Sequence, residues 1–130
     1  MKIPKPAKPK KARDKKKRLE KEGLRLWFKV CYKPQCELCG EPTKDVHHFF
    51  LRSSAGWLKF DPDNAVSLCV KCHTRKHWKQ DPRIDNEIRE KKGEEWYKRI
   101  ITKRNTVPKP SYKTLEWLKK QIINLNKYKR

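Results

Sequence analysis

The sequence predicts a small α+β domain whose core surrounds two pairs of cysteines, with helices and basic tails on either side. Four of the five cysteines form two C-x-x-C pairs, separated by 29 residues (40–68). Strand-like runs and turn signals lie between the pairs, and apolar residues at helical spacing lie outside them. Only 35% of the 130 residues are hydrophobic and 39% are charged, so the apolar core is too thin to stabilise the fold alone.

The N-terminal part is expected to hold a tail and one helix. Residues 1–18 are rich in Lys and Pro and nearly free of apolar side chains, which predicts disorder. A helix is expected over Leu19–Tyr32, and Pro34 ends it. Gly23 lies inside this helix and weakens the helical pattern.

The Cys- and His-rich segment 33–80 is expected to form the core of a domain that spans 19–104. A strand is expected at Val46–Leu51, because apolar and polar residues there suit a half-buried strand. Residues 66–79 are expected to end in a helix that carries Cys72, His73 and His77.

Two helical stretches and a linker are expected after the core. A charged helix is expected over about 83–104, and Gly93 is the candidate point at which it divides. A linker is expected over residues 105–110. A basic amphipathic helix is expected within 111–130, with its apolar side formed by Leu115, Leu118, Ile122 and Leu125. Three roles stay open for this helix: packing on the domain, docking a partner, or contacting a DNA backbone through its Lys-rich other face.

The charge is concentrated at the two ends of the chain. Lys and Arg exceed Asp and Glu by 36 to 15, which gives +21, and residues 1–18 and 98–130 carry +9 and +10 of it. Such a charge indicates a polyanionic partner, with nucleic acid ahead of an anionic membrane surface. The alternative is tails that only add solubility. No membrane span and no secretory signal fits the sequence, so we expect a cytoplasmic protein.

The two cysteine pairs predict a structural zinc site. Cys36 and Cys39 can place both sulfurs on one tight turn, Cys69 and Cys72 can do the same, and four thiolates complete a tetrahedral Zn²⁺ site. A reducing compartment makes zinc a better interpretation than two disulfides. The fifth cysteine, Cys31, is most simply a small apolar residue of the first helix.

All four histidines lie within or just beyond this scaffold. His73 and His77 are four residues apart, so a helix places them on one face, where they can share a metal. His47 and His48 are adjacent on the expected strand, so their side chains point to opposite faces. One of them can then join the metal of His73 and His77. The alternative, that histidines replace cysteine ligands of the zinc, leaves all four unexplained.

The order of these residues resembles the HNH nucleases. Cys36-x-x-Cys39, Val46-His47-His48, Asn64, Leu68-Cys69-x-x-Cys72-His73 and His77 follow one another with similar spacing over about residues 33–80. The resemblance implies a ββα-metal fold, in which a catalytic metal lies between a hairpin and a helix. A weaker similarity, over His47 to Ile100, connects the chain with phage recombination nucleases of the Rap (NinG) type, and implies a phage or mobile-element origin.

The resemblance also implies roles for individual residues. His47, His73 and His77 would bind a catalytic divalent metal, and His48 would be the general base. Asn64 would hold the catalytic strand through its amide side chain. The products would carry 5′-phosphate and 3′-hydroxyl ends. Histidine ligands suit Zn²⁺, Ni²⁺ or Mn²⁺, whereas Mg²⁺ prefers oxygen and would depend on phosphate and water.

Three basic residues near the histidines are candidates for nucleic-acid binding: Arg52, Arg75 and Lys76. Arg75 or Lys76 is the preferred phosphate clamp, and a solvated helix face is the alternative. Trp57 and Trp78 are suited to stacking on bases, but in a domain of this size we expect them in the core.

Three functions fit the sequence. The first is a metal-dependent DNA endonuclease that nicks or cuts duplex or branched DNA with low sequence specificity, as a monomer or homodimer. The second is a zinc-stabilised nucleic-acid-binding module without catalysis, which would not need the four histidines and Asn64 together. The third is an adaptor in a phage recombination or packaging assembly. The first is favoured because His48 accompanies a full set of metal ligands.

Overall fold

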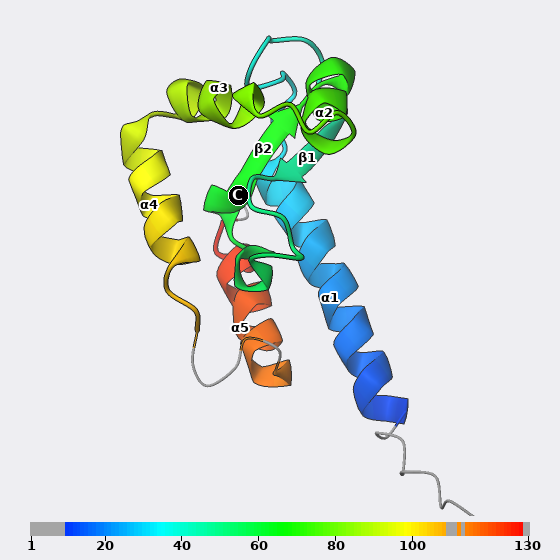
Figure 1. The fold of residues 1–130 in the computed structure, drawn as a ribbon. Coiled ribbons are helices and arrows are strands. Elements are labelled where there is room, and N and C mark those ends of the chain that lie inside the picture. Colours follow the sequence, from blue (N-terminus) through cyan, green and yellow to red (C-terminus); the bar gives the residue numbers. More distant parts are fainter. Residues whose placement is uncertain (1–9, 109–111, 113, 129–130) are drawn as a thin grey trace, which may run out of the picture.

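The computed structural model describes residues 10–108, 112 and 114–128, and places a two-stranded hairpin at the centre of five helices (Figure 1). Strand β1 (Asp45–His48) pairs antiparallel with β2 (Ala65–Leu68), and helix α2 (Val70–His77) follows β2 after a single residue. The predicted α+β class and the ββα arrangement are confirmed. The expected strand over Val46–Leu51 is shorter and begins one residue earlier.

The register of the hairpin sorts its side chains onto two faces. His47 pairs with Val66 and His48 pairs with Ala65. Because cross-strand partners share a face, His47 lies on the face of Val66 and His48 on the face of Ala65. The expectation that the two histidines point to opposite faces is therefore confirmed.

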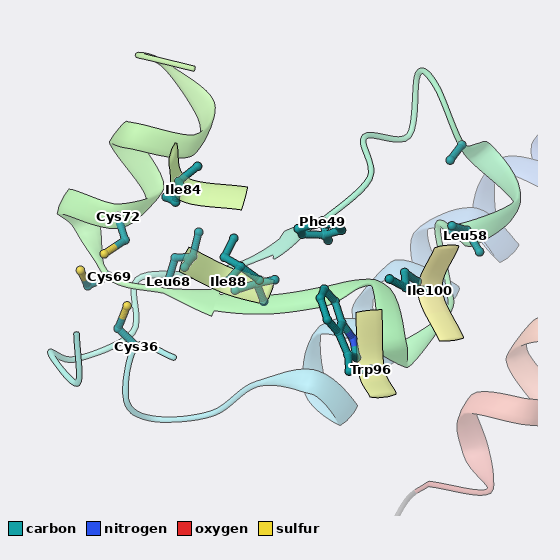
Figure 2. Close-up of a cluster of buried hydrophobic side chains, with 12 residues drawn as sticks. Cys36, Phe49, Leu58, Leu68, Cys69, Cys72, Ile84, Ile88, Trp96 and Ile100 are labelled. Carbon is teal, nitrogen blue, oxygen red and sulfur yellow. The ribbon is translucent and has the colours of Figure 1, made fainter. Parts of the chain in front are cut away.

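Each face of the hairpin has its own hydrophobic cluster. The Val66 face packs against α2, α3 (Arg83–Lys92) and α4 (Glu94–Arg104), with Ile88, Trp96 and Ile100 among the buried residues (Figure 2). The Ala65 face packs against α1 (Lys10–Cys31) and α5 (Leu115–Asn126), through residues such as Leu26 and Leu118. The C-terminal helix therefore packs on the domain, against α1.

The first helix begins at Lys10, nine residues before the expected start. The predicted disorder of residues 1–18 is wrong for 10–18, while residues 1–9 lie outside the described residues. Lys and Arg have long unbranched side chains that favour helix, and three acid–base pairs at i,i+4 spacing offset the repulsion among cations. These pairs are Asp14–Arg18, Lys16–Glu20 and Arg18–Glu22. Figure 1 shows this half of α1 extending beyond the rest of the fold.

The remaining boundaries differ less from expectation. The charged stretch over 83–104 is divided at Gly93 into α3 and α4, as expected. Gly93 has a φ of 99°, a conformation that favours glycine. The linker expected over 105–110 is non-helical over 105–108, and Ser111, the expected start of the last helix, lies outside the described residues. No helix among the described residues is both long and apolar enough to cross a membrane.

Gly23 is explained by a close approach between α1 and Phe60. A Cβ atom at Gly23 would lie 2.7 Å from Cε1 of Phe60, whose ring is only 2% exposed. Replacing Gly23 with alanine should gain about 1 kcal/mol of helix propensity but cost about 1–3 kcal/mol of overpacking, so we expect a net loss of stability. Urea unfolding measures this, with exposed Glu22→Ala as the control on the same helix. A Gly23→Ala variant more stable than the wild type would show that the Phe60 ring can move aside at little cost and would contradict this explanation of Gly23.

Candidate functional site

The four cysteines of the two C-x-x-C pairs form one cluster. All four Sγ atoms lie within 4.8 Å of one another, with Cys39 Sγ 3.4 Å from Cys69 Sγ and 3.9 Å from Cys72 Sγ. Sulfur atoms bound to one tetrahedral zinc ion are about 3.8 Å apart. Figure 2 shows the sulfur atoms of Cys36, Cys69 and Cys72 turned toward one another at one end of the buried cluster. The four thiols can therefore bind one structural Zn²⁺.

Backbone geometry favours the thiolate form of one member of this cluster, Cys36. Gly40 N–H donates to the Cys36 carbonyl at 3.0 Å, which closes the first turn, and Gly40 has a φ of 80°. Burial alone would raise the pKa of Cys36, but backbone N–H groups, including those of Cys39 and Cys69, lower it to about 7. N–H donors toward sulfur stabilise the deprotonated form that binds metal.

The residue inside the first pair ties the cysteine turn to the hairpin. A carboxylate oxygen of Glu37 accepts from the Ser67 backbone N–H at 2.6 Å, and the other lies 2.9 Å from Nζ of Lys92 on α3. Although burial opposes it, Lys92 and these hydrogen bonds lower the pKa of Glu37. The cysteine turn, β2 and α3 are therefore held together by one ionised carboxylate.

Three histidines meet on the α2 side of the hairpin. The ring centres of His47, His73 and His77 are 5.3, 5.7 and 5.5 Å apart. Rings that bind one ion through nitrogen atoms about 2.1 Å away have centres about 5 Å apart. The structure thus brings together the three predicted metal ligands, one from β1 and two from α2.

The protonation of these histidines suits metal binding. Nε2 of His47 and Nδ1 of His73 are buried and have no hydrogen-bond partner, which is costly unless a ligand satisfies them. Burial, followed by the charges of His73 and Lys76, lowers the pKa of His47 to about 4, so its ring is neutral. Among the described residues, the four cysteines are the one group of possible metal ligands whose ligand atoms all lie within 4.8 Å of one another, so the nitrogen atoms of the three histidines are farther apart. Binding one ion would therefore need at least one histidine ring to rotate, and His77 is the exposed one of the three.

His48 is held apart from this group, on the face that packs against α1. Its ring stacks on Trp27 with centres 4.0 Å apart and an interplanar angle of 2°. Its Nε2 lies 2.8 Å from the carbonyl oxygen of Lys59. Because a carbonyl only accepts, Nε2 carries the hydrogen and Nδ1 keeps a free lone pair. Burial lowers the pKa of His48 in spite of this hydrogen bond, so the neutral ring is favoured.

Asn64 fastens the loop that follows β1. Its side chain is fully buried, accepts from the Phe50 N–H at 2.8 Å, and donates to the carbonyls of Phe50 and Leu58 at 3.0 and 3.2 Å. Its own carbonyl accepts from the Phe49 N–H at 3.0 Å. These bonds are of the kind that the family resemblance implies for Asn64, since they connect the end of the histidine strand to the turn before β2.

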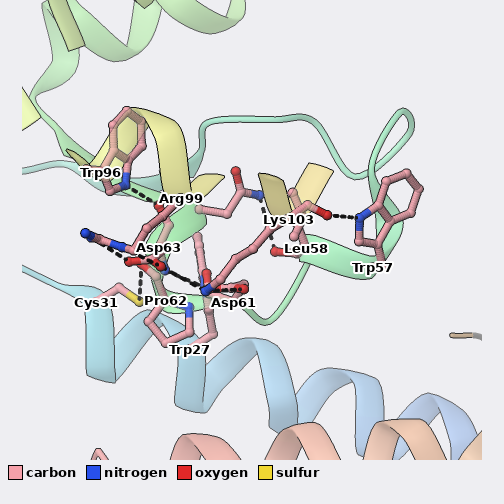
Figure 3. Close-up of polar contacts among 11 residues, drawn as sticks. Trp27, Cys31, Trp57, Leu58, Asp61, Pro62, Asp63, Trp96, Arg99 and Lys103 are labelled. Atoms are coloured by element: carbon pink, nitrogen blue, oxygen red, sulfur yellow. Dashed lines mark hydrogen bonds and ion pairs between the residues drawn. The ribbon is translucent and has the colours of Figure 1, made fainter. Parts of the chain in front are cut away.

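The turn before Asn64 is itself anchored by two tryptophans and a lysine, and a third tryptophan bonds to that lysine (Figure 3). Trp27 and Trp96 donate their indole N–H to the carbonyls of Asp61 and Asp63, at 2.9 and 2.7 Å. The ammonium group of Lys103 pairs with the side-chain carboxylates of Asp61 and Asp63. The backbone carbonyl of Lys103 accepts a hydrogen bond from the indole of Trp57 at 2.9 Å. The turn is therefore fixed to α1 and α4, which sets the position of Asn64.

Replacing Asn64 with alanine should lower the free energy of unfolding by about 2–4 kcal/mol, because three backbone groups lose the fully buried side chain that is their partner. Asn64→Asp should be no better, since a carboxylate can accept from Phe50 but cannot donate to two carbonyls. Urea unfolding checks both variants. Exposed Asn86→Ala on α3 is the matched control, and an equal, small change in all three would contradict this role of Asn64.

All four histidines line one open pocket of about 520 Å³ between α1, the hairpin and the end of α2. Two exposed cations, Lys44 and Arg52, line the same pocket. Asp45 also lines it, as expected for a residue on the same face of β1 as His47. Its carboxylate accepts from the Val46 N–H at 2.8 Å. The pocket thus combines neutral nitrogen ligands with positive charge, which suits an anionic substrate.

Two of the three predicted phosphate-binding residues are turned elsewhere. Arg75 pairs with Asp81 and Glu87, and Lys76 pairs with Asp85, which are acids on or before α3. Neither Arg75 nor Lys76 lines the histidine pocket. In the structure they join α2 to α3, and their role as a phosphate clamp stays a prediction. Only Arg52 of the three lies where expected.

The sequence did not place either Trp27 or Trp78 at this pocket. Trp27 lies within the helix expected over 19–32, and its stacking on His48 joins residues 21 positions apart, which no local pattern predicts. Trp78 was expected in the core but is 73% exposed beside His77. Trp57 is partly buried, in agreement with expectation. Trp78 directly follows α2, which has only eight residues, and a position at the end of a short helix favours exposure.

Residues 36–79 match the family described as HNH endonuclease. These are 44 of the 130 residues, and they include both cysteine pairs, all four histidines and Asn64. The resemblance of the segment 36–79 to the HNH family, which the sequence predicted, is therefore confirmed. No curated protein and no solved structure matches the chain significantly, so the weaker similarity to phage recombination nucleases gains no support there.

Proposed function

We propose that this protein is a metal-dependent DNA endonuclease that hydrolyses phosphodiester bonds in the histidine pocket. One observation carries the proposal: a neutral His48 with a free Nδ1 lone pair lines the same pocket as His47, His73 and His77. A purely DNA-binding module has no use for a proton acceptor beside a group of metal ligands. The HNH match gives the proposal its reaction class.

His48 is the proposed general base. Its Nε2–H donates to the Lys59 carbonyl, so the ring is fixed in the tautomer that offers Nδ1 to a water molecule. Stacking on Trp27 holds the plane of the ring. A neutral imidazole can take a proton from water near physiological pH, which turns that water into the attacking nucleophile. Trp27 and Lys59 are positioning residues in this proposal.

His47, His73 and His77 are the proposed ligands of the catalytic divalent metal, and their partnerless buried nitrogens suit this role. When bound, such an ion polarises the phosphate and stabilises the leaving 3′ oxygen. Arg52 and Lys44 supply fixed positive charge at the same pocket and would orient the phosphate there. The product would carry a 5′-phosphate, as the family resemblance implies.

The exposed cations of α1 are the proposed surface for the DNA backbone. Arg13, Lys15, Lys17, Arg18 and Lys21 are all exposed on the half of the helix that extends from the domain. Phosphate contacts position DNA without reading its sequence, so we expect low sequence specificity and binding that weakens steeply with salt. A phage or mobile-element origin, a recombination partner and a cytoplasmic location stay predictions of the sequence.

A supercoiled-plasmid assay tests the proposal. The zinc-containing protein is freed of loosely bound metal, and Mg²⁺, Mn²⁺, Ni²⁺ and Zn²⁺ are then added separately. We expect nicked circles with at least one ion, and most readily with a transition metal, because the ligands are nitrogen atoms. DNA binding under all four ions, with neither nicking of the plasmid nor cleavage of a single-stranded or forked oligonucleotide, would overturn the proposal and favour a non-catalytic binding module or adaptor.

A further inference from the structure

The mouth of the histidine pocket gathers exposed apolar side chains. Phe28, Leu51 and Trp78 line this pocket and are 38%, 49% and 73% exposed. Trp78 is the most exposed large hydrophobic residue among those the structure describes. Exposed apolar groups that gather at a pocket indicate a surface for binding. We call Phe28, Leu51 and Trp78 the apolar rim.

Trp78 differs from the three tryptophans that support the core. The indoles of Trp27, Trp57 and Trp96 each donate to a backbone carbonyl and support the fold. Trp78 caps the C-terminus of α2 and belongs to neither hydrophobic cluster. Its ring centre lies 4.8 Å from that of the proposed metal ligand His77, at an angle of 86°. A ligand at the metal centre would therefore have the Trp78 ring beside it.

The chemistry around the rim narrows the class of ligand. Lys44 and Arg52 line the same pocket, so positive charge and an exposed aromatic ring are offered together. This combination binds single-stranded nucleic acid, in which cations contact phosphates and aromatic rings stack on bases. Inside a perfect duplex the faces of the bases are covered by their neighbours. An aromatic ring outside the grooves can stack only on a base that is unpaired or displaced.

We propose that the pocket selects DNA in which a nucleotide next to the scissile phosphate is unpaired, and that its base stacks on Trp78. The substrate class is thus single-stranded, gapped or forked DNA rather than continuous duplex. The inference rests on the proposed nuclease function, because it places the scissile phosphate at the histidines. Phe28 and Leu51 would exclude water from the sides of the stacked base.

Binding measured without cleavage tests this inference. His48→Ala serves as the background, with zinc retained, and fluorescein-labelled single-stranded, forked and fully paired DNA of the same sequence are compared by anisotropy at one salt concentration. We expect Trp78→Ala to weaken binding of single-stranded and forked DNA about 5-fold to 100-fold. Binding of fully paired DNA should change by less than about 2-fold, because its phosphate contacts remain.

Three further variants separate stacking from other roles. Trp78→Phe keeps an aromatic face and should restore most of the binding, whereas Trp78→Leu should not. Ile123→Ala removes another exposed apolar side chain, on α5, which is 59% exposed and does not line the pocket, and should have no effect. Equal loss on paired and unpaired DNA, or no loss with Trp78→Ala, would overturn the inference. No loss would leave Trp78 as a surface for another partner.

The two proposals fail in different ways. If the wild-type protein nicks plasmid but Trp78→Ala binds unpaired DNA normally, only the inference about Trp78 is wrong. If no metal supports cleavage but the preference for unpaired DNA depends on Trp78, the stacking site stands and the nuclease proposal is wrong.

Discussion

Replacing His48 with alanine is expected to lower the rate of plasmid nicking by about 10²-fold to 10⁴-fold, the usual contribution of a general base. DNA binding should be retained, because His48 carries no charge at neutral pH and the cations of the pocket are unchanged. The rate is measured under single-turnover conditions at saturating protein, which separates chemistry from binding.

Two comparisons distinguish loss of the general base from loss of packing or of the fold. His48→Phe keeps a ring that can stack on Trp27 but has no lone pair, so it should be as inactive as His48→Ala. Cleavage restored by His48→Phe would show that the ring serves only packing. Both variants lose the hydrogen bond to the Lys59 carbonyl, so urea unfolding must show that they fold.

A metal titration distinguishes the base from the ligands. His73→Ala should raise the metal concentration that gives half-maximal cleavage, because it removes one of three ligands, and excess metal should restore part of the activity. His48→Ala should not respond to added metal. Rescue of His48→Ala by metal would move His48 into the metal site and contradict the tautomer that its contact with Lys59 indicates.

Replacing Cys72 with alanine is expected to abolish the cooperative fold at room temperature. Structural zinc contributes about 10–16 kcal/mol in small zinc domains, which equals or exceeds the total stability of about 5–15 kcal/mol typical of a domain. Here the four cysteines connect the loop before β1 with the start of α2, and Cys36, Cys69 and Cys72 are part of the larger hydrophobic cluster. Losing one ligand therefore loosens both the histidine strand and the histidine helix.

Cys31→Ala is the matched control, because Cys31 lies on α1 outside the cysteine cluster. Burial raises the pKa of Cys31 to about 12, so its side chain stays a thiol. Zinc content and thermal unfolding are measured together. We expect one zinc per chain and near wild-type unfolding for Cys31→Ala, and loss of both for Cys72→Ala. A Cys72→Ala protein that unfolds like the wild type would show that the fold does not depend on this site.

Several features of the site follow from short-range patterns that the sequence contains. The two C-x-x-C turns predict the cysteine cluster because three-residue spacing alone brings two sulfurs together. The alternation of a strand places His47 and His48 on opposite faces, and helical spacing places His73 and His77 on one face. Each of these predictions needs only the geometry of one element, and each agrees with the structure.

Other features depend on contacts between segments far apart in the sequence, and only the tertiary structure decided them. Arg75 and Lys76 face the acids of α3 rather than the pocket, because α3 turns back toward α2. The Lys59 carbonyl selects the tautomer of His48, and Trp27 on α1 fixes the plane of its ring. Charge and amphipathicity are properties of a segment, so they predict which side chains are available. Which partner each side chain contacts depends on how the segments pack. Packing of the segments is also the reason that Trp96 is buried whereas Trp78 is exposed.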